Sequence, residues 1–236
     1  MKTNAPSTWQ TYRILLAKDL RHEMRTRDLL TSMGLYAVLI LIVFGAAFAQ
    51  VGDKVDIQRM AAGLVWTTLV FTSLLGLSRS FAYEEEAGAL EGVLLTPADR
   101  SCIYLAKLTA NLIFLLVVEV VVLPLFYFLF LTATTPTDSF AFSLLPLFLG
   151  TFGISSVGTL LASITANARG KEVLLAILFI PVIFPLLYAV VAASTGAVVA
   201  SIGWELVFRN SCILAGAYDI IMTLASWLLY DYVIGS

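Results

Sequence analysis

The sequence predicts an all-α, polytopic membrane protein with six transmembrane helices and an N-terminal amphipathic helix at the membrane interface. Of its 236 residues, 60% are hydrophobic and only 13% are charged, and the mean hydropathy is +0.93. An average soluble domain is about 45–50% apolar, Gly included, and about 25% charged. A globule of this length leaves much of its surface exposed, so its own core cannot cover so many apolar side chains. A lipid bilayer must cover the rest.

Six apolar runs are long enough to form membrane-spanning helices. A bilayer core about 30 Å thick is crossed by about 20 apolar helical residues, whereas a barrel strand needs only about 9–11. The runs cover residues 33–49, 61–78, 104–131, 140–164, 173–193 and 212–232. Polar or turn-forming breaks separate them at residues 50–60, 79–103, 132–139, 165–172 and 194–211.

Basic residues gather on one side of these spans. Eleven Lys and Arg residues fall in the N-terminal segment, the 79–107 connection and the 165–172 turn, against three on the other side: Lys54, Arg59 and Arg209. The positive-inside rule then places both termini in the cytoplasm. The net charge of −2 gives no basic surface for nucleic acid, so no nucleic-acid partner is expected.

Residues 1–31 are expected to form a cytoplasmic N-terminal segment, with an amphipathic interfacial helix over residues 8–28. Apolar side chains recur at three- or four-residue steps: Trp9, Tyr12, Leu16, Leu20 and Met24. Charged side chains share the opposite face: Lys18, Arg21, Arg25 and Asp28. Such a helix lies at the acyl boundary with its basic face toward anionic lipid or a cytoplasmic partner. The alternative is a solvated basic helix that only fixes topology. Glu23 interrupts the apolar stripe and is spaced to pair with Arg27.

The remaining residues, 32–236, are expected to form the transmembrane domain, with a charged cytoplasmic hairpin at residues 79–103. Its carboxylates are dense: Glu84, Glu85, Glu86 and Glu91. Gly88 permits a turn or a close backbone approach, and Pro97 disfavours helix at the residue before it. The hairpin suits docking to another protein, since apolar residues such as Leu90 need a partner or the membrane surface. A solvated loop is the alternative, because runs of charge usually face water.

Motifs for catalysis and metal binding are missing from the sequence. There is no GxxxxGK[ST] loop for ATP and no HExxH or GxSxG motif, so the chain is not expected to be an enzyme. Cys102 and Cys212 are far apart, and His22 is the only histidine, so neither a disulfide scaffold nor a metal site is expected.

Two acidic residues, Glu119 and Asp219, fall well inside predicted spans. Glu119 lies in the middle of the third run, and Asp219 lies about a turn and a half from the outer end of the sixth. A charge at the bilayer centre costs at least about 2.5–3.5 kcal/mol, so such residues normally face a bundle interior or a wet cavity. Both are candidates for a functional site. The alternative is a structural role as protonated or paired groups, although the sequence identifies no cation within the membrane as their partner.

Prolines also fall inside the apolar runs. Pro124 lies in the third run, Pro146 in the fourth, and Pro181 and Pro185 in the fifth. Each removes a backbone hydrogen bond and can kink its helix. Kinks of this kind occur both in bundles that open and close and in static ones.

One stretch resembles the CcmB family, the haem-exporter permeases of cytochrome c maturation. It reads Phe81-Ala-Tyr-Glu-Glu-Glu-Ala-Gly88-Ala-Leu90-Glu91-Gly-Val-Leu-Leu95-Thr96-Pro97 and is followed by Leu105-Ala106-Lys107. The run Ile180-Pro181-Val-Ile-Phe-Pro185-Leu-Leu is similar to the fifth span of that family. The resemblance covers essentially the whole chain and implies an ABC-2 exporter-type permease.

The resemblance implies partners rather than an active site. Two copies would pair with two copies of the ATP-binding subunit CcmA, in a bacterial inner membrane, together with CcmC and CcmD. ATP hydrolysis would drive delivery of haem to the periplasmic chaperone CcmE, or release of its haem-loaded form. The residues carried over to the ATPase-coupling element are Glu84, Glu85, Glu86, Gly88, Leu90, Glu91 and Pro97.

Haem is expected at most as cargo, and ATP only through the partner subunit. A single cytoplasmic histidine argues against ligation of haem by two histidines, so no bound cofactor is predicted. Two other functions stay open from the sequence: a general ABC-2 exporter permease for lipid, drug or polysaccharide, and a membrane scaffold that assembles partners without gating.

Overall fold

The computed structural model describes residues 8–51, 57–86, 100–130, 137–166, 168–199 and 203–235. These residues form α1 (Thr8–Thr26), α2 (Asp28–Val51), α3 (Ile57–Glu86), α5 (Arg100–Phe130), α6 (Thr137–Thr165), α7 (Lys171–Val199) and α8 (Trp204–Gly235). No strand occurs in these ranges, and the predicted all-α class is confirmed.

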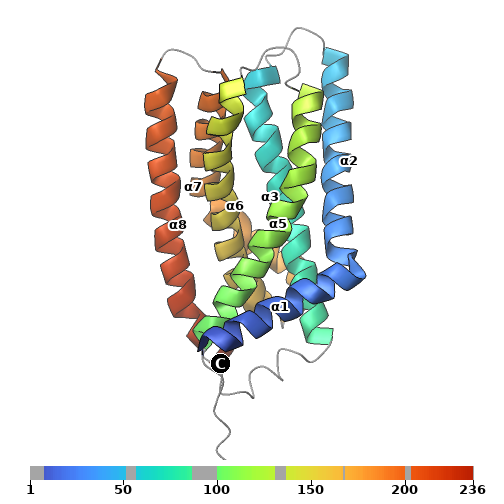
Figure 1. Ribbon diagram of the computed structural model, residues 1–236, viewed down its shortest axis with the longest axis vertical. Coiled ribbons are helices and arrows are strands. Elements are labelled where there is room, and N and C mark those ends of the chain that lie inside the picture. The colour runs from blue at the N-terminus through green and yellow to red at the C-terminus, as the bar shows by residue number, and fades with distance from the viewer. Residues whose placement is uncertain are drawn as a thin grey trace, which may run out of the picture.

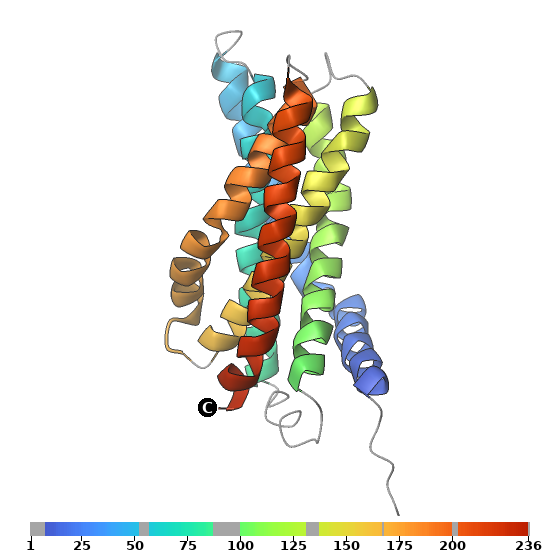
Figure 2. The same cartoon turned by 90° about the vertical axis from the view of Figure 1, so that its left-hand side faces the viewer.

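All helices except α1 run side by side as an elongated bundle (Figures 1 and 2). Each of the six contains a stretch long and apolar enough to cross a membrane: residues 28–50, 59–80, 100–130, 143–165, 171–198 and 204–230. The six predicted spans are therefore confirmed. Helix α1 lies across one end of the bundle, the end at which α8 also finishes (Figure 1). We call this the α1 end and the opposite one the far end; the sequence predicts that the α1 end faces the cytoplasm.

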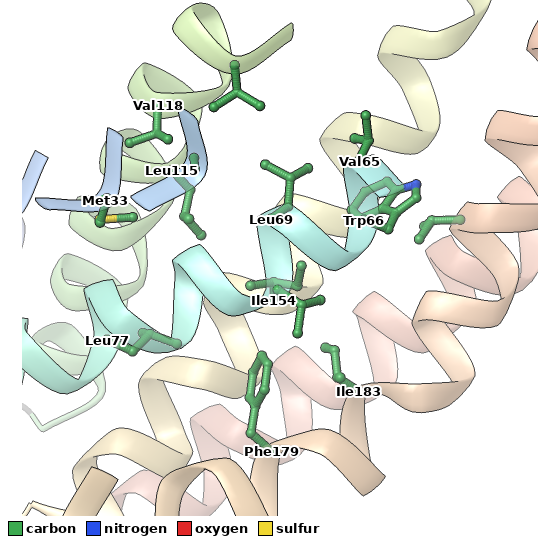
Figure 3. Close-up of a cluster of buried hydrophobic side chains, with 14 of the residues drawn as sticks. Met33, Val65, Trp66, Leu69, Leu77, Leu115, Val118, Ile154, Phe179 and Ile183 are labelled. Atoms are coloured by element: carbon green, nitrogen blue, oxygen red, sulfur yellow. The ribbon is translucent and has the colours of Figure 1, made fainter. Parts of the chain in front are cut away.

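An apolar core joins the six helices. Met33 of α2, Trp66 of α3, Ile154 of α6 and Phe179 of α7 are each at most 2% exposed and gather in the centre (Figure 3). Large apolar side chains also cover the outside of the bundle, among them Leu39, Val120, Phe184 and Ile220. A surface of this kind is unfavourable in water and is matched by acyl chains.

Helix α6 packs closely against its neighbours because glycines occupy its contact positions. A Cβ atom at Gly150 would overlap the indole ring of Trp66 on α3. A Cβ atom at Gly153 would overlap the carboxyl group of Asp219 on α8 and the side chain of Leu186 on α7. Small residues at such points let helix backbones approach within a membrane.

Helices extend into several of the predicted breaks. The break expected at residues 194–211 is much shorter, because α7 continues to Val199 and α8 begins at Trp204. Polar residues such as Glu205 and Arg209 suggested a loop there, but they are exposed positions in the first turns of α8. At the end of a span such side chains can reach the interface. The hairpin expected at residues 79–103 is helical at both ends, where α3 continues to Glu86 and α5 begins at Arg100, and its middle part lies outside the described residues.

Helix α7 contains two prolines and is visibly bent in its middle part (Figure 2). Pro181 and Pro185 cannot donate a backbone hydrogen bond, which loosens the helix around them. Between them, the carbonyl of Val182 accepts a hydrogen bond from the hydroxyl of Tyr218 on α8, at 2.7 Å. A neighbouring helix thus supports the backbone next to the prolines, as is common in membrane bundles.

Candidate functional site

The predicted ATPase-coupling element begins at the α1 end of the bundle. The backbone of Glu84, Glu85 and Glu86 forms the last turn of α3. Their side chains, and all of Gly88, Leu90, Glu91 and Pro97, lie outside the described residues. The role of these seven residues in coupling stays a prediction.

Glu119 projects from α5 into the bundle and is 2% exposed. Its Oε1 atom accepts a hydrogen bond from the hydroxyl of Thr151 on α6. Its Oε2 atom has no hydrogen-bond partner among the described residues. The carboxyl group is therefore held by one neutral donor, inside the protein and away from lipid.

Asp219 is also buried, with 3% of its surface exposed. It lies near the middle of the membrane-spanning part of α8, so the predicted position near the outer end of the sixth span is wrong. The earlier start of α8 explains the difference, because eight more residues precede it in the helix. Neither carboxyl oxygen has a hydrogen-bond partner among the described residues. Their neighbours on α6 and α7 are Gly153 and Leu186.

The two acids lie at similar depth but on different sides of α6. Glu119 bonds to Thr151, and Asp219 packs at Gly153, two residues further along the same helix. Since successive residues of an α-helix are turned by about 100°, these two contact points lie on nearly opposite faces. The structure therefore does not join Glu119 and Asp219 into one carboxylate pair. No metal-binding group of three or more His, Cys, Asp or Glu side chains occurs in the described ranges either.

A seam of hydrogen bonds joins α5, α6 and α8, and Glu119 is the only one of its residues predicted as a site from the sequence. Besides Glu119 and Thr151, the amide of Asn111 donates to the hydroxyl of Thr159 at 2.9 Å. At the level of Ser156, which lies between Thr151 and Thr159 on α6, the hydroxyls of Tyr104 and Ser156 lie 2.9 Å apart, and that of Ser156 lies 2.9 Å from the hydroxyl of Thr223. Polar residues at 104, 111 and 119 recur at seven- and eight-residue steps, which places them on one helix face. That spacing could have revealed the seam.

A second polar cluster fastens α1 to the first turns of α5. Lys107 is 7% exposed, and its Nζ atom lies 3.0 Å from Oδ2 of Asp19. The hydroxyl of Tyr12 donates to that of Thr109 at 3.1 Å, and the thiol of Cys102 lies 3.2 Å from the carbonyl oxygen of Thr8. We call this cluster the α1 clamp. In the sequence, Lys107 contributes only to the predicted orientation, and no pattern distinguishes Asp19 as a partner for it.

The apolar stripe of α1 is only partly free to meet lipid. Leu16 and Leu20 pack against the bundle core, whereas Trp9 and Met24 are 65% and 74% exposed. Glu23, which seemed to spoil the stripe, is buried, and its Oε1 atom accepts a hydrogen bond from the backbone N–H of Leu30 at 2.9 Å. The suggested ion pair with Arg27 is therefore wrong. Glu23 instead satisfies a donor at the start of α2, where the first N–H groups have no partner within the helix.

Comparison with known proteins decides the family. The model of the family described as "CcmB protein" matches residues 10–227. The chain belongs to the CcmB family. Among CcmB relatives, the heme exporter protein B of Rhodobacter capsulatus is 30% identical over 176 residues, covering 74% of this chain and 78% of the relative. That of Pseudomonas aeruginosa is 29% identical over 176 residues, which cover 75% of this chain and 77% of the relative. That of Paracoccus denitrificans is 28% identical over 203 residues, which cover 85% of this chain and 90% of the relative.

The CcmB match includes most of the regions described above. It begins within α1 and ends within α8, so the hydrogen-bonded seam, both buried acids and all of the α1 clamp except Thr8 fall inside it. The resemblance to this family that the acidic stretch predicted is confirmed. The family does not by itself assign a role to any of these residues.

Proposed function

We propose that this chain is the permease subunit of an ABC transporter that acts in cytochrome c maturation in a bacterial inner membrane. The observation that carries the proposal is the family match over residues 10–227, in a chain whose relatives are named heme exporter protein B. Haem is then the cargo handled by the complex, and the periplasmic chaperone CcmE is its recipient or is released in its haem-loaded form.

ATP hydrolysis takes place in a separate subunit, CcmA, and CcmC and CcmD complete the complex, with two copies of the permease. A membrane bundle without a nucleotide site changes state only if a partner binds one of its states more tightly. The ATPase supplies this preference by binding at the α1 end, which faces the cytoplasm in this proposal. Residues 1–31 and the hairpin at 79–103 form its docking side, and the helices within 32–236 form the moving part.

Charge reversal in the hairpin tests the coupling role. We expect Glu84→Lys with Glu91→Lys to abolish co-purification of CcmA and formation of holocytochrome c, while the chain still inserts into the membrane. Glu205→Lys is the matched control, since Glu205 is an exposed acid in the first turn of α8 at the far end. Normal assembly and normal holocytochrome c in the double variant would show that the hairpin does not dock the ATPase.

The identity of co-purifying proteins tests the wider proposal. An ATPase recovered together with CcmC, CcmD and CcmE homologues supports a cytochrome c maturation complex. An ATPase recovered without them, in cells whose holocytochrome c is unaffected by deletion of this chain, indicates a permease for another cargo. Normal holocytochrome c after crosslinking of α3 to α7 indicates a scaffold that does not move.

A further inference from the structure

Polar side chains form a stripe along one face of α8, the helix that runs from the far end to the α1 end (Figure 1). Its members recur at steps of three or four residues, which keeps them on one side of a helix: Asp219, Thr223, Ser226 and Tyr230. Thr223 is half-buried and the other three are at most 3% exposed, whereas Ile220, next to Asp219, is 64% exposed. This α8 stripe therefore faces the interior of the bundle.

The α8 stripe meets the hydrogen-bonded seam at Thr223. The hydroxyl of Thr223 lies 2.9 Å from that of Ser156 on α6, which in turn lies 2.9 Å from the hydroxyl of Tyr104 on α5. The rings of Tyr104 and Tyr230 pack with their centroids 5.2 Å apart. Tyr230 lies about 16 Å from Asp219 along the helix axis, toward the α1 end. Hydroxyl groups thus occupy the turns of the stripe between Asp219 and the α1 end.

Buried polar groups approach the two acids from one end of the bundle. Among the side chains of α5, α6 and α8 that the structure describes, each buried polar one lies level with Glu119 or Asp219, or nearer the α1 end. The buried positions of α5 and α8 on the other side of the acids are apolar: Val122, Phe126, Phe130 and Ala215. Tyr127 and Ser143 carry hydroxyls there, 3.3 Å apart, but both are half-buried, and Tyr127 lies about 12 Å beyond Glu119 along α5.

Asp219 ends this stripe with a carboxyl group that has no hydrogen-bond partner among the described residues, beside Gly153 and Leu186. The charged and titratable side chains of the surrounding helices bond elsewhere, point outward or lie about two turns or more away: Lys107, Glu119 and Tyr127 on α5, Lys171, Glu172 and Tyr188 on α7, and Cys212 and Tyr218 on α8. The side chains described on α6 include none. A buried carboxylate without a donor or a cation is strongly disfavoured, so the group binds a proton instead.

We propose that Asp219 is a proton-binding site within the membrane, loaded and emptied from the α1 end through the hydroxyls of the α8 stripe. Residues four apart are neighbours on a helix face, so rotation of the Asp219 and Thr223 side chains closes the last step. Each hydroxyl accepts a proton on one side and releases its own on the other. The hydroxyls are thus unchanged, while the carboxylate of Asp219 gains one O–H bond and becomes neutral. Buried acids within membrane spans commonly mark proton relays.

The bound proton sets how closely α8 can pack on α6. Neutral Asp219 fits against Gly153, where a Cβ atom would overlap its carboxyl group. A charged carboxylate at the same point needs a hydrogen-bond donor or water, which favours separation of the two helices. Release of the proton toward the α1 end is therefore expected to loosen this contact. The site is independent of the cargo that the complex carries.

Infrared spectroscopy of the purified full chain tests the site. The C=O stretch of a protonated carboxyl group is resolved from the amide bands and moves to lower frequency when deuterium replaces the proton. At neutral pH we expect one such band that Asp219→Asn removes and that shifts in heavy water. Thr223→Val removes the hydroxyl beside Asp219 but keeps the shape of the side chain. It should slow the exchange by about a hundredfold, the lower end of what a positioned proton-transfer group contributes.

A second variant and two controls complete the experiment. Ser226→Ala interrupts the stripe further along and should also slow the exchange, even if Thr223→Val does not fold. Thr67→Val is the matched control, since Thr67 is exposed on α3 and its hydroxyl donates to the carbonyl of Gly63 on its own helix. Tyr127→Phe removes a hydroxyl toward the far end. Both controls should leave the exchange rate unchanged.

Three results would overturn the proposal. One is a spectrum without any carboxylic-acid band that Asp219→Asn removes, since Asp219 would then hold no proton. Another is an unchanged exchange rate in the folded stripe variants, or a band that never shifts in heavy water. The third is slower exchange in Tyr127→Phe than in the stripe variants, which would place the entry of the proton at the far end.

Discussion

Lys107 and Glu119 lie about three turns apart on α5, and their surroundings differ. Lys107, near the α1 end, is buried against Asp19 and forms an ion pair brought to it by α1. Glu119, deep in the bundle, accepts a hydrogen bond from the neutral hydroxyl of Thr151. A charged side chain near the α1 end can thus form an ion pair with a residue of α1, the helix that lies across the bundle. At mid-depth, the described helices supply hydroxyls and glycines instead.

The largest loss of unfolding free energy is expected when the ion pair between Lys107 and Asp19 is broken. Lys107→Met removes the buried cation of Asp19 and leaves only the more exposed Lys18 beside it, at 3.4 Å. We expect the unfolding free energy to fall by about 3 kcal/mol, the usual scale when a buried ion pair loses one partner. SDS-induced unfolding in mixed micelles measures this loss of unfolding free energy. The double variant Asp19→Leu with Lys107→Met should recover most of it, because two apolar residues can replace a buried pair.

Lys18→Met provides the matched control for this experiment. Lys18 also lies near Asp19, at 3.4 Å, but 43% of its side chain is exposed. Ion pairs of exposed residues contribute about 0–1 kcal/mol, so the change should be small. Equal losses for Lys18→Met and Lys107→Met would show that burial does not distinguish the two pairs.

The next effect concerns the glycine that separates α6 from Asp219. Gly153→Ala introduces a Cβ atom into space occupied by Asp219 and Leu186, and overpacking of this kind costs about 1–3 kcal/mol. Gly216→Ala on α8 is the control, since a Cβ atom there meets nothing within 4 Å. Unfolding of both variants under the same conditions gives the difference. If Gly153→Ala is as stable as Gly216→Ala, the close approach at Asp219 is not required.

A smaller effect is expected at Glu119. Glu119→Gln keeps an acceptor for the Thr151 hydroxyl and should leave the unfolding free energy nearly unchanged. Glu119→Leu removes the acceptor and should lower the unfolding free energy by about 1 kcal/mol, within the range of about 0.6–2 kcal/mol found for hydrogen bonds between membrane helices. Holocytochrome c formation, measured in the same two variants, separates packing from transport. Loss of activity in Glu119→Gln at normal stability would give the carboxyl group a role beyond this hydrogen bond.

The smallest loss of unfolding free energy is expected at the bend of α7. Tyr218→Phe removes the hydrogen bond to the carbonyl of Val182 and should cost about 0.6 kcal/mol, an average value for such bonds in membranes. Tyr188→Phe, at a 69% exposed position on the same bent helix, is the control and should have no measurable effect on unfolding. A loss above about 2 kcal/mol for Tyr218→Phe would exceed the range of a single hydrogen bond.

The number of spans could be predicted because apolar length alone decides which segments cross a bilayer. The start of α8 could not, since Glu205 and Arg209 look like loop residues unless their side chains are known to reach the interface. The α1 clamp could not either: no local pattern links Asp19 to Lys107, and only tertiary packing brings them together. The buried acids stood out because charge is rare in a span, but their different neighbours on α6 depend on helix rotation.

The α1 clamp also has a consequence for how the protein is made. Asp19 leaves the ribosome about 90 residues before Lys107, which at 5–20 residues per second is a wait of about 5–18 seconds. During this interval α5 has not been synthesised, so α1 cannot occupy its final position. Because α1 is amphipathic, it can bind to the membrane surface during this interval. Once Lys107 has been synthesised, its ion pair with Asp19 holds α1 against the bundle. The ion pair therefore joins α1 to a helix that is completed only after two spans, α2 and α3, have been synthesised.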